Sequence, residues 1–249
     1  MRTPVRGRET RFLGETGFLA CVLSLVVAAA GLSTASDVPP RRTATFSIVA
    51  HDPARQEWGV ASASKVVAVG AGVPWGQAGA GAIATQSLTN VTYGPRGLKL
   101  LERGGTAADV VKALTDADRD REDRQLGIVD AKGNAAHFTG KGCDPWAGAK
   151  LGKNYVCLGN LLKGKEVIDD MATAFEKSKG PLAWRMMAAL EAGERAGGDK
   201  RGKQSAAILV VRAPANPADG DHAVDLRVDD HARPIQELAR ILALELPKP

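Results

Sequence analysis

The sequence has few aromatic residues, few histidines and cysteines, and no large excess of charge of one sign. Aromatic side chains make up 4% of the 249 residues, so the flat faces on which nucleic-acid bases stack are scarce. The formal net charge of +5 is too small to indicate nucleic acid or an anionic membrane as a partner. The four histidines and the cysteines Cys143 and Cys157 do not follow metal-ligand spacing. We therefore expect no nucleic-acid partner, no metal and no organic cofactor.

What the chain does contain is typical of a soluble globular protein. Apolar residues account for 44% of the chain and charged residues for 24%, which excludes the collagenous, coiled-coil and wholly disordered classes. Glycine is abundant, with 28 residues, and so is alanine, so we expect a core of small and aliphatic side chains. A chain of this length forms one large domain or two small ones.

Residues 1–35 follow the order of a secretory signal peptide, which is basic, then apolar, then small. Four arginines precede an apolar stretch at residues 17–32, and Ser33-Thr34-Ala35 follows it. A permanent membrane anchor is the alternative, but the apolar stretch is shorter than the ~20 residues that span a bilayer. We predict cleavage after Ala35, which leaves no stable membrane anchor and gives an exported protein, either periplasmic or secreted.

Residues 36–44 combine two prolines with charged residues and show no periodicity, which predicts a disordered spacer. A single folded domain is then expected over residues 45–249. In an oxidising compartment Cys143 and Cys157 either form a disulfide or remain as two buried free thiols, and the sequence leaves both alternatives open.

The order of predicted elements indicates an α+β protein. Residues 45–51 and 58–64 flank a turn and predict a β-hairpin, whose antiparallel pairing sets Thr45 opposite Ser64, with Lys65 next to it. Strands are also predicted at residues 79–86, 125–130, 135–139, 155–158, 205–212 and 223–228, and helices after Gly94, after Thr106 and at residues 166–177, 182–196 and 234–244. This order is neither a strict βαβ alternation nor an all-β series, so antiparallel sheets covered by helices fit best.

Three short motifs favour ordinary structural explanations or remain minor alternatives. The GxGxxA pattern at residues 79–84 runs into a strand pattern, which favours close packing over dinucleotide binding. Asp116, Asp118 and Asp120 lack the glycine and glutamate of a calcium loop. Ser62 and Lys65 match the S-x-x-K pattern of Ser-Lys acyl-transfer enzymes, but that pattern normally opens a helix and here it lies in an extended segment.

Several blocks of the sequence together resemble the domain-of-unknown-function family 1028, which is grouped with the N-terminal nucleophile hydrolases. The blocks are TFSIVAHDP from Thr45, WGVASAS from Trp58, ATQ from Ala84, YGPRG from Tyr93, GNLL from Gly159 and GGDKRGKQSA from Gly197. The resemblance covers roughly residues 45–212. It implies a four-layer αββα sandwich, and it implies a hydrolase whose nucleophile is the first residue of the mature chain.

In such a hydrolase Thr45 would attack an amide carbonyl while its own α-amine takes the proton. A free α-amine has a pKa of about 7.7–8.0 and can act as a base near neutral pH, whereas a peptide nitrogen cannot. The peptide bond between Ala44 and Thr45 must therefore be cleaved, and attack of the Thr45 hydroxyl on its own preceding carbonyl is one route. Signal peptidase is disfavoured, because Arg42 lies three residues before the bond where a small residue is needed.

The hairpin and the family blocks supply the other candidate site residues. We expect the charge of Lys65 to lower the pKa of the Thr45 amine and to favour a developing alkoxide. Asn160, in a turn after a strand, is a candidate donor to the oxyanion. An Asp-Arg pair before a buried strand either clamps a substrate amine or carboxylate or staples the loop. The candidate substrate-binding residues are Ser64, Asp199, Arg201, Gln204 and Ser205.

The prediction that follows is an exported amidohydrolase that cleaves a small amide or peptide bond. Thr45 is its nucleophile and base, Lys65 tunes that residue, and Asn160 helps to hold the oxyanion. A homo-oligomer is left open. The alternative is a non-catalytic binding or structural protein that keeps the sandwich but does not free Thr45.

Overall fold

A computed structural model describes residues 42–216, 218 and 220–248. The predicted signal peptide and residues 36–41 of the predicted spacer lie outside the described residues. The end of that spacer differs from the prediction, because Arg42–Thr43 forms a strand, β1, and Ala44 is buried. The residues directly before Thr45 are therefore held against the domain rather than disordered.

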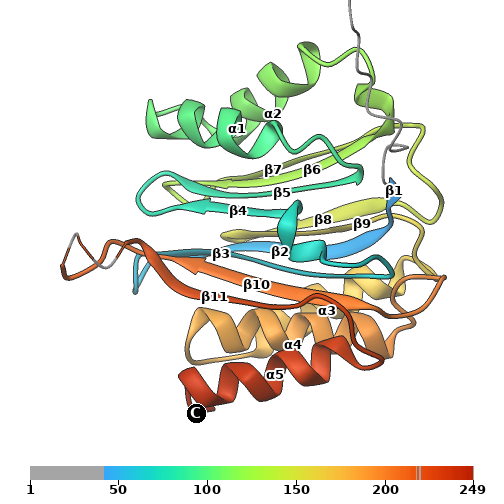
Figure 1. Cartoon of the computed structure of the whole chain (residues 1–249). Coiled ribbons are helices and arrows are strands. Elements are labelled where there is room, and N and C mark those ends of the chain that lie inside the picture. The colour runs from blue at the N-terminus through green and yellow to red at the C-terminus, as the bar shows by residue number, and fades with distance from the viewer. Residues whose placement is uncertain (1–41, 217, 219, 249) are drawn as a thin grey trace, which may run out of the picture. The chain divides into compact units, whose positions relative to one another are not determined.

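Two antiparallel sheets lie at the centre of the fold (Figure 1). Besides β1, the first sheet contains β4 (Pro74–Gln77), β5 (Gly81–Leu88), β6 (Arg124–Asp130) and β7 (Ala135–Thr139). We call it sheet A; its order is β1-β5-β6-β7, and β4 also pairs with β5. The second, sheet B, contains β2 (Thr45–Asp52), β3 (Glu57–Ser64), β8 (Gly148–Gly152), β9 (Tyr155–Gly159), β10 (Ser205–Val211) and β11 (His222–Val228). Its order is β11-β10-β3-β2-β9-β8.

Helices cover the outer face of each sheet and complete four layers (Figure 1). The helices α1 (Tyr93–Glu102) and α2 (Ala107–Asp116) share an apolar core with sheet A. Three more, α3 (Glu166–Lys177), α4 (Leu182–Arg195) and α5 (Pro234–Glu245), share a second core with sheet B. A third core of Val, Ala and Leu side chains, closed by Trp58, fills the space between the sheets. The predicted α+β class and the four-layer αββα sandwich are confirmed.

The alternation of side chains along β2 decides which residues face the space between the sheets. Phe46, Ile48 and Ala50 belong to the core beneath α3, α4 and α5, whereas Val49 belongs to the core between the sheets. Successive side chains of a strand point to opposite faces. Thr45 and Ser47 therefore point between the sheets, as Val49 does.

The opening hairpin forms in the register predicted from the sequence. Thr45 pairs with Ser64 at its open end, and Asp52 pairs with Glu57 next to the turn. The Asp52 carboxylate accepts the backbone N–H of Ala54 at 3.0 Å, which is the local bond by which aspartate favours a turn. This turn fixes the register at the other end of the hairpin, where the candidate nucleophile lies.

Besides β1, two strands, β4 and β8, are not predicted by the sequence patterns. The first reads PWGQ and the second GAKLG, and proline and glycine are depleted in strands. The packing of β4 is visible at Gly94 of α1, because a Cβ atom there would overlap the ring of Trp75. Tertiary contacts, rather than local propensity, thus place these two strands.

The fold also decides two expectations about small motifs. The GxGxxA pattern leads into strand β5 and not into a helix, so it lacks the helix N-terminus that would hold a pyrophosphate. Cys143 and Cys157 are both buried and free. Of the two alternatives, the structure therefore has two buried free thiols and not a disulfide.

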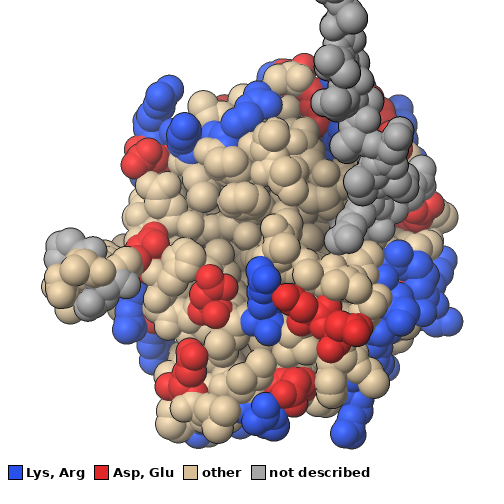
Figure 2. Space-filling view, viewed as in Figure 1, with Lys and Arg blue, Asp and Glu red and all other residues tan. Residues whose placement is uncertain are grey.

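On the face shown in Figure 2, charged side chains of both signs lie interspersed. No helix of the described part of the chain is long and apolar enough to cross a membrane.

Asp118, from the aspartate-rich segment, is the centre of a partly buried polar cluster. Its carboxylate accepts hydrogen bonds from Arg124 Nε at 3.0 Å, Asn90 Nδ2 at 3.0 Å and the Tyr93 hydroxyl at 2.9 Å. Burial of the carboxyl raises its pKa, but the bonds from Arg124 and Asn90 outweigh that effect and hold the pKa of Asp118 well below its ordinary value. The segment thus ties the start of α1 to β6.

We expect Asp118→Asn to lower the free energy of unfolding at neutral pH by about 2 kcal/mol, because Arg124 loses its buried partner. The native pKa of Asp118 is depressed, so the carboxylate stabilises the fold above its unfolded pKa of about 4 and less as the pH falls. The difference between wild type and variant should therefore shrink in acid. Urea unfolding at neutral and at acidic pH measures it, and a constant difference would contradict the charge argument.

Candidate active site

Thr45 is the first residue of β2 and is fully buried. Its partner across the hairpin is Ser64, and the Thr45 hydroxyl donates to Ser64 Oγ at 3.3 Å. Ser64 Oγ in turn donates to the main-chain carbonyl oxygen of Ala44. Two hydroxyl groups therefore link the candidate nucleophile to the carbonyl of the peptide bond that precedes it.

Arg201 supplies a second donor to the same carbonyl. Its Nη2 atom donates to the Ala44 oxygen at 3.1 Å. Asp199, whose side chain is fully buried, accepts from Nη2 of Arg201 at 2.8 Å and from Nε at 3.1 Å. A hydroxyl and a guanidinium thus converge on one carbonyl oxygen, where both would stabilise the negative charge that develops when the carbonyl carbon is attacked.

The main chain of Thr45 is fixed from the other side by two amides. The backbone N–H of Asn160 donates to the Thr45 carbonyl oxygen at 3.1 Å, and Gln86 Nε2 donates to the same oxygen at 3.2 Å. The side chain of Asn160 donates to Gln125 Oε1 at 3.0 Å. Asn160 therefore holds Thr45 in place, and its described contacts lie behind the nucleophile rather than at the Ala44 carbonyl.

Three buried polar residues of this network, Ser47, Gln86 and Gln125, are not predicted as site residues from the sequence. Gln86 accepts from Ser47 Oγ at 2.6 Å and donates to Gln125 at 2.8 Å, and Gln125 donates to the Gly159 carbonyl at 2.8 Å. Each of the three lies in a strand whose other residues are mostly apolar or glycine. Because buried polar groups must find partners, such interruptions of an apolar strand are the signal that could have indicated the network.

Two of the predicted substrate-binding residues, Gln204 and Ser205, support the loop that follows β3. The backbone N–H of Gln204 donates to the Ser64 carbonyl at 3.1 Å. Ser205 Oγ donates to the Val66 carbonyl at 2.6 Å and accepts the N–H of Val69 at 3.1 Å. Through these contacts Gln204 and Ser205 hold the main chain at and after Ser64. The arrangement at the Ala44 carbonyl is formed by Ser64, Asp199 and Arg201.

Lys65 lies close to the site through its backbone and not through its charge. Its amide N–H donates to Asp199 at 3.0 Å, but its side chain is exposed. Within the described residues, no hydrogen bond or ion pair of its ammonium group is seen. Lys65 comes after the last paired residue of β3, so its side chain leaves the sheet, and the cation that faces the Ala44 carbonyl is Arg201 instead.

Replacing Lys65 with Met should therefore leave the chemistry of Thr45 nearly unchanged, because an exposed charge is largely screened by water and salt. We expect the pH–rate profiles of the wild type and of Lys65→Met to superpose within about twofold. The profiles are measured on the chain that begins at Thr45. A shift of the acidic limb to higher pH in the variant would return Lys65 to the role predicted from the sequence.

The S-x-x-K pair does not come together in the structure. Ser62 is buried, and its hydroxyl oxygen accepts from Ser47 Oγ at 2.9 Å. Lys65 is exposed at the end of the hairpin, and residues three apart along an extended chain point to opposite sides. A lysine that cannot reach the serine cannot take its proton, so this geometry does not favour the Ser-Lys alternative.

The residues before Thr45 lie along the edge of sheet A. Arg42 pairs with Leu88 and Thr43 with Ser87 in an antiparallel ladder. On the same side of β5, strand β4 pairs with residues 81–84, so β1 extends that edge towards Thr45. Within the described residues, no group of three His, Cys, Asp or Glu side chains could hold a metal ion.

Comparison with known proteins identifies a family whose model matches this sequence. The model of a family of unknown function (DUF1028) matches residues 45–238, a match that begins at Thr45. A crystal structure of a protein from Silicibacter pomeroyi, described by the same family model, is 35% identical with a TM-score of 0.74. That similarity covers 81% of this chain and 85% of the other.

Two other solved structures are similar at a much lower level. Eukaryotic HslV from Trypanosoma brucei is 10% identical with a TM-score of 0.44, over 68% of this chain and 99% of that one. Anbu, an ancestral beta-subunit from Yersinia bercovieri, is 11% identical with a TM-score of 0.38, over 82% and 98% of the two chains. None of the curated proteins is significantly similar to the chain.

Proposed function

The chain belongs to the family of unknown function DUF1028, and we propose that it is an exported amidohydrolase whose nucleophile is the hydroxyl of Thr45. The observation that carries the proposal is the arrangement at the Ala44–Thr45 peptide bond. The hydroxyl of Thr45 is linked through Ser64 to the Ala44 carbonyl, and Arg201 donates to the same oxygen at 3.1 Å. An ordinary strand threonine has no need of a guanidinium on the carbonyl that precedes it.

The first reaction of this site is cleavage of its own chain. Thr45 Oγ attacks the carbonyl carbon of Ala44 while Ser64 and Arg201 hold the oxyanion. The bond between that carbon and the Thr45 nitrogen breaks, the hydroxyl proton passes to the nitrogen, and an ester joins Ala44 to Thr45 Oγ. Water then hydrolyses the ester, which leaves a carboxylate on Ala44 and a free amine and hydroxyl on Thr45.

The freed residue then has both groups that amide hydrolysis needs. Its α-amine, with an ordinary pKa of about 7.7–8.0, accepts the hydroxyl proton near neutral pH. The hydroxyl oxygen attacks the substrate carbonyl, whose oxygen takes the position that the Ala44 oxygen held between Ser64 and Arg201. The amine of the substrate leaves with the proton, and water releases the acyl group from Thr45.

The position of β1 supports a small amide or a peptide as the substrate. In the uncleaved chain Ala44 is the acyl group of the scissile bond, and Arg42 and Thr43 continue it along β5. Once this segment has left, an acyl group of similar size can occupy the same space. The edge of β5 at Ser87 and Leu88 then offers backbone groups to an extended peptide.

We expect the exported protein to begin at Thr45, because the donors at Ala44 accelerate cleavage of that bond. A preparation that starts at Ser36 should shorten by the nine residues before Thr45 without added protease. Intact mass and N-terminal sequencing follow the conversion, and cell fractionation locates the shortened chain. A chain that stays uniformly at Ser36 would contradict the hydrolase and favour the non-catalytic binding or structural protein.

A further inference from the structure

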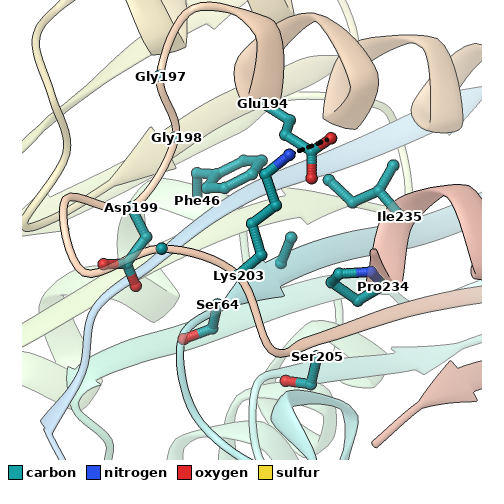
Figure 3. Close-up of a pocket in the computed structure, with 12 residues that line it drawn as sticks. Phe46, Ser64, Glu194, Gly197, Gly198, Asp199, Lys203, Ser205, Pro234 and Ile235 are labelled. Carbon is teal, nitrogen blue, oxygen red and sulfur yellow. Dashed lines mark ion pairs between the residues drawn. The ribbon is translucent and has the colours of Figure 1, made fainter. Parts of the chain in front are cut away.

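A small pocket lies beside the site but on the opposite face of sheet B (Figure 3). Its volume is about 50 Å³. Phe46 and Ala63 form its floor, and both side chains belong to the core beneath the helices. Thr45 points between the sheets, so the pocket is separated from the nucleophile by the sheet itself. Ser64 and Asp199, which belong to the arrangement at Ala44, also line this pocket, so the tests below measure ligand binding and not amide hydrolysis.

Glu194 of α4 brings a carboxylate with one unused oxygen into this pocket. Its side chain is 9% exposed. Lys203 Nζ contacts Oε2 at 3.0 Å, and Gln236 Nε2 donates to the same oxygen at 2.6 Å. The other oxygen, Oε1, is buried and has no hydrogen-bond partner in the described part of the chain. Figure 3 shows this oxygen turned towards the space between Lys203 and Ile235.

The charge and shape of the pocket select the kind of ligand that could pair with Glu194. The charged side chains that line the pocket are Glu194, Asp199 and Lys203. Asp199 is already paired with Arg201, so the acceptor left for a ligand is Glu194 Oε1. The remaining walls include the ring of Phe46 and the side chain of Ile235. An aromatic face attracts a cation. A buried carboxylate oxygen without a donor is unfavourable.

We propose that this pocket binds a small primary ammonium ion with a short apolar tail, such as ethylammonium or propylammonium. The ammonium group donates to Glu194 Oε1, in a charge-assisted bond that is stronger than a neutral one. The tail lies against Phe46 and Ile235. One water molecule needs about 10–15 Å³ of cavity volume measured in this way. The pocket, at about 50 Å³, therefore holds about three or four non-hydrogen atoms.

The test titrates the whole chain with methyl-, ethyl- and propylammonium and follows binding by ligand-observed NMR at constant ionic strength. We expect saturable binding of ethylammonium, and at least tenfold weaker binding of ethanol, which has the same number of non-hydrogen atoms but no charge. Equal binding of ethylammonium and ethanol, or no saturable binding of any primary ammonium, would overturn the proposal.

Two variants assign the binding to Glu194. Glu194→Gln keeps the shape and removes the charge, and it should weaken ethylammonium binding about tenfold. Glu237→Gln is the matched control, because Glu237 is a carboxylate of α5 paired on the surface with Arg240, and it should bind as the wild type does. An unchanged Glu194→Gln would overturn the assignment.

Lys203→Met tests the same site through an expected gain in affinity for ethylammonium, and the substituted side chain is not buried. The side chain of Lys203 is 46% exposed, so the variant should fold. Removing a positive charge that competes for Glu194 should tighten ethylammonium binding several-fold. Weaker or unchanged binding in this variant would contradict the proposed pairing.

Discussion

The Thr45→Ala chain should remain uncleaved at residue 44 and hydrolyse no amide, while it folds as the wild type does. The variant lacks the oxygen that attacks in both reactions, and an indispensable nucleophile accounts for a loss of about a thousandfold or more. The Thr45 hydroxyl donates to Ser64 Oγ at 3.3 Å, and loss of a neutral hydrogen bond changes the free energy of unfolding by about 1 kcal/mol, so the variant should stay folded. Intact mass, activity on a panel of small amides and urea unfolding give the three readouts.

Thr45→Ser is the matched control for this substitution. It keeps the hydroxyl and its bond to Ser64, so cleavage and hydrolysis should persist within about tenfold. Ser62→Ala separates the remaining alternative, because Ser62 is the serine of the S-x-x-K pair. Full activity of Thr45→Ala together with inactive Ser62→Ala would reject the N-terminal nucleophile and restore the Ser-Lys enzyme.

The part of the site that the sequence predicts is the part that depends on one hairpin. Alternating residues on both sides of the Asp52 turn determine a register, and a register determines that Thr45 faces Ser64. No long-range information is needed for this pair. The four-layer architecture is predicted as well, because the family resemblance and the order of strands and helices agree.

The contacts that the sequence does not predict come from segments far apart in the chain. Arg201 meets Ala44 across 157 residues, and Gln86 meets Thr45 across 41. The alternation along a strand predicts whether Gln86 is buried or exposed. It does not predict which carbonyl oxygen accepts the hydrogen bond from its side-chain amide. Lys65 illustrates the reverse case, because proximity in sequence to Ser64 does not bring its ammonium to the site when the strand ends there.

Arg201→Met should slow cleavage of the Ala44–Thr45 bond about a hundredfold, which is the usual effect of removing one donor from an oxyanion hole. Methionine keeps most of the aliphatic length and removes the guanidinium that donates to Ala44 at 3.1 Å. The variant leaves the carboxylate of Asp199 buried without its cation, so Arg201→Lys is compared with it. Lysine restores the charge but not the two-pronged contact with Asp199 at 2.8 and 3.1 Å, and an intermediate rate is expected.

The control for this substitution is Arg227→Met, because Arg227 forms an ion pair with Asp229 in which both side chains are about half exposed. Arg227→Met should be cleaved at the wild-type rate, because the loss of a surface ion pair changes the stability of the fold little. The time course of intact mass, measured for chains that start at Ser36, gives all four rates. If Arg201→Met is cleaved as fast as Arg227→Met, the guanidinium only staples the loop around Asp199 and Ser64 alone holds the oxyanion. Arg201→Lys keeps a cation beside the buried Asp199, so a slowed Arg201→Lys that unfolds in urea with the wild-type midpoint assigns the lost donor to the chemistry, whereas loss of a structural staple would lower that midpoint.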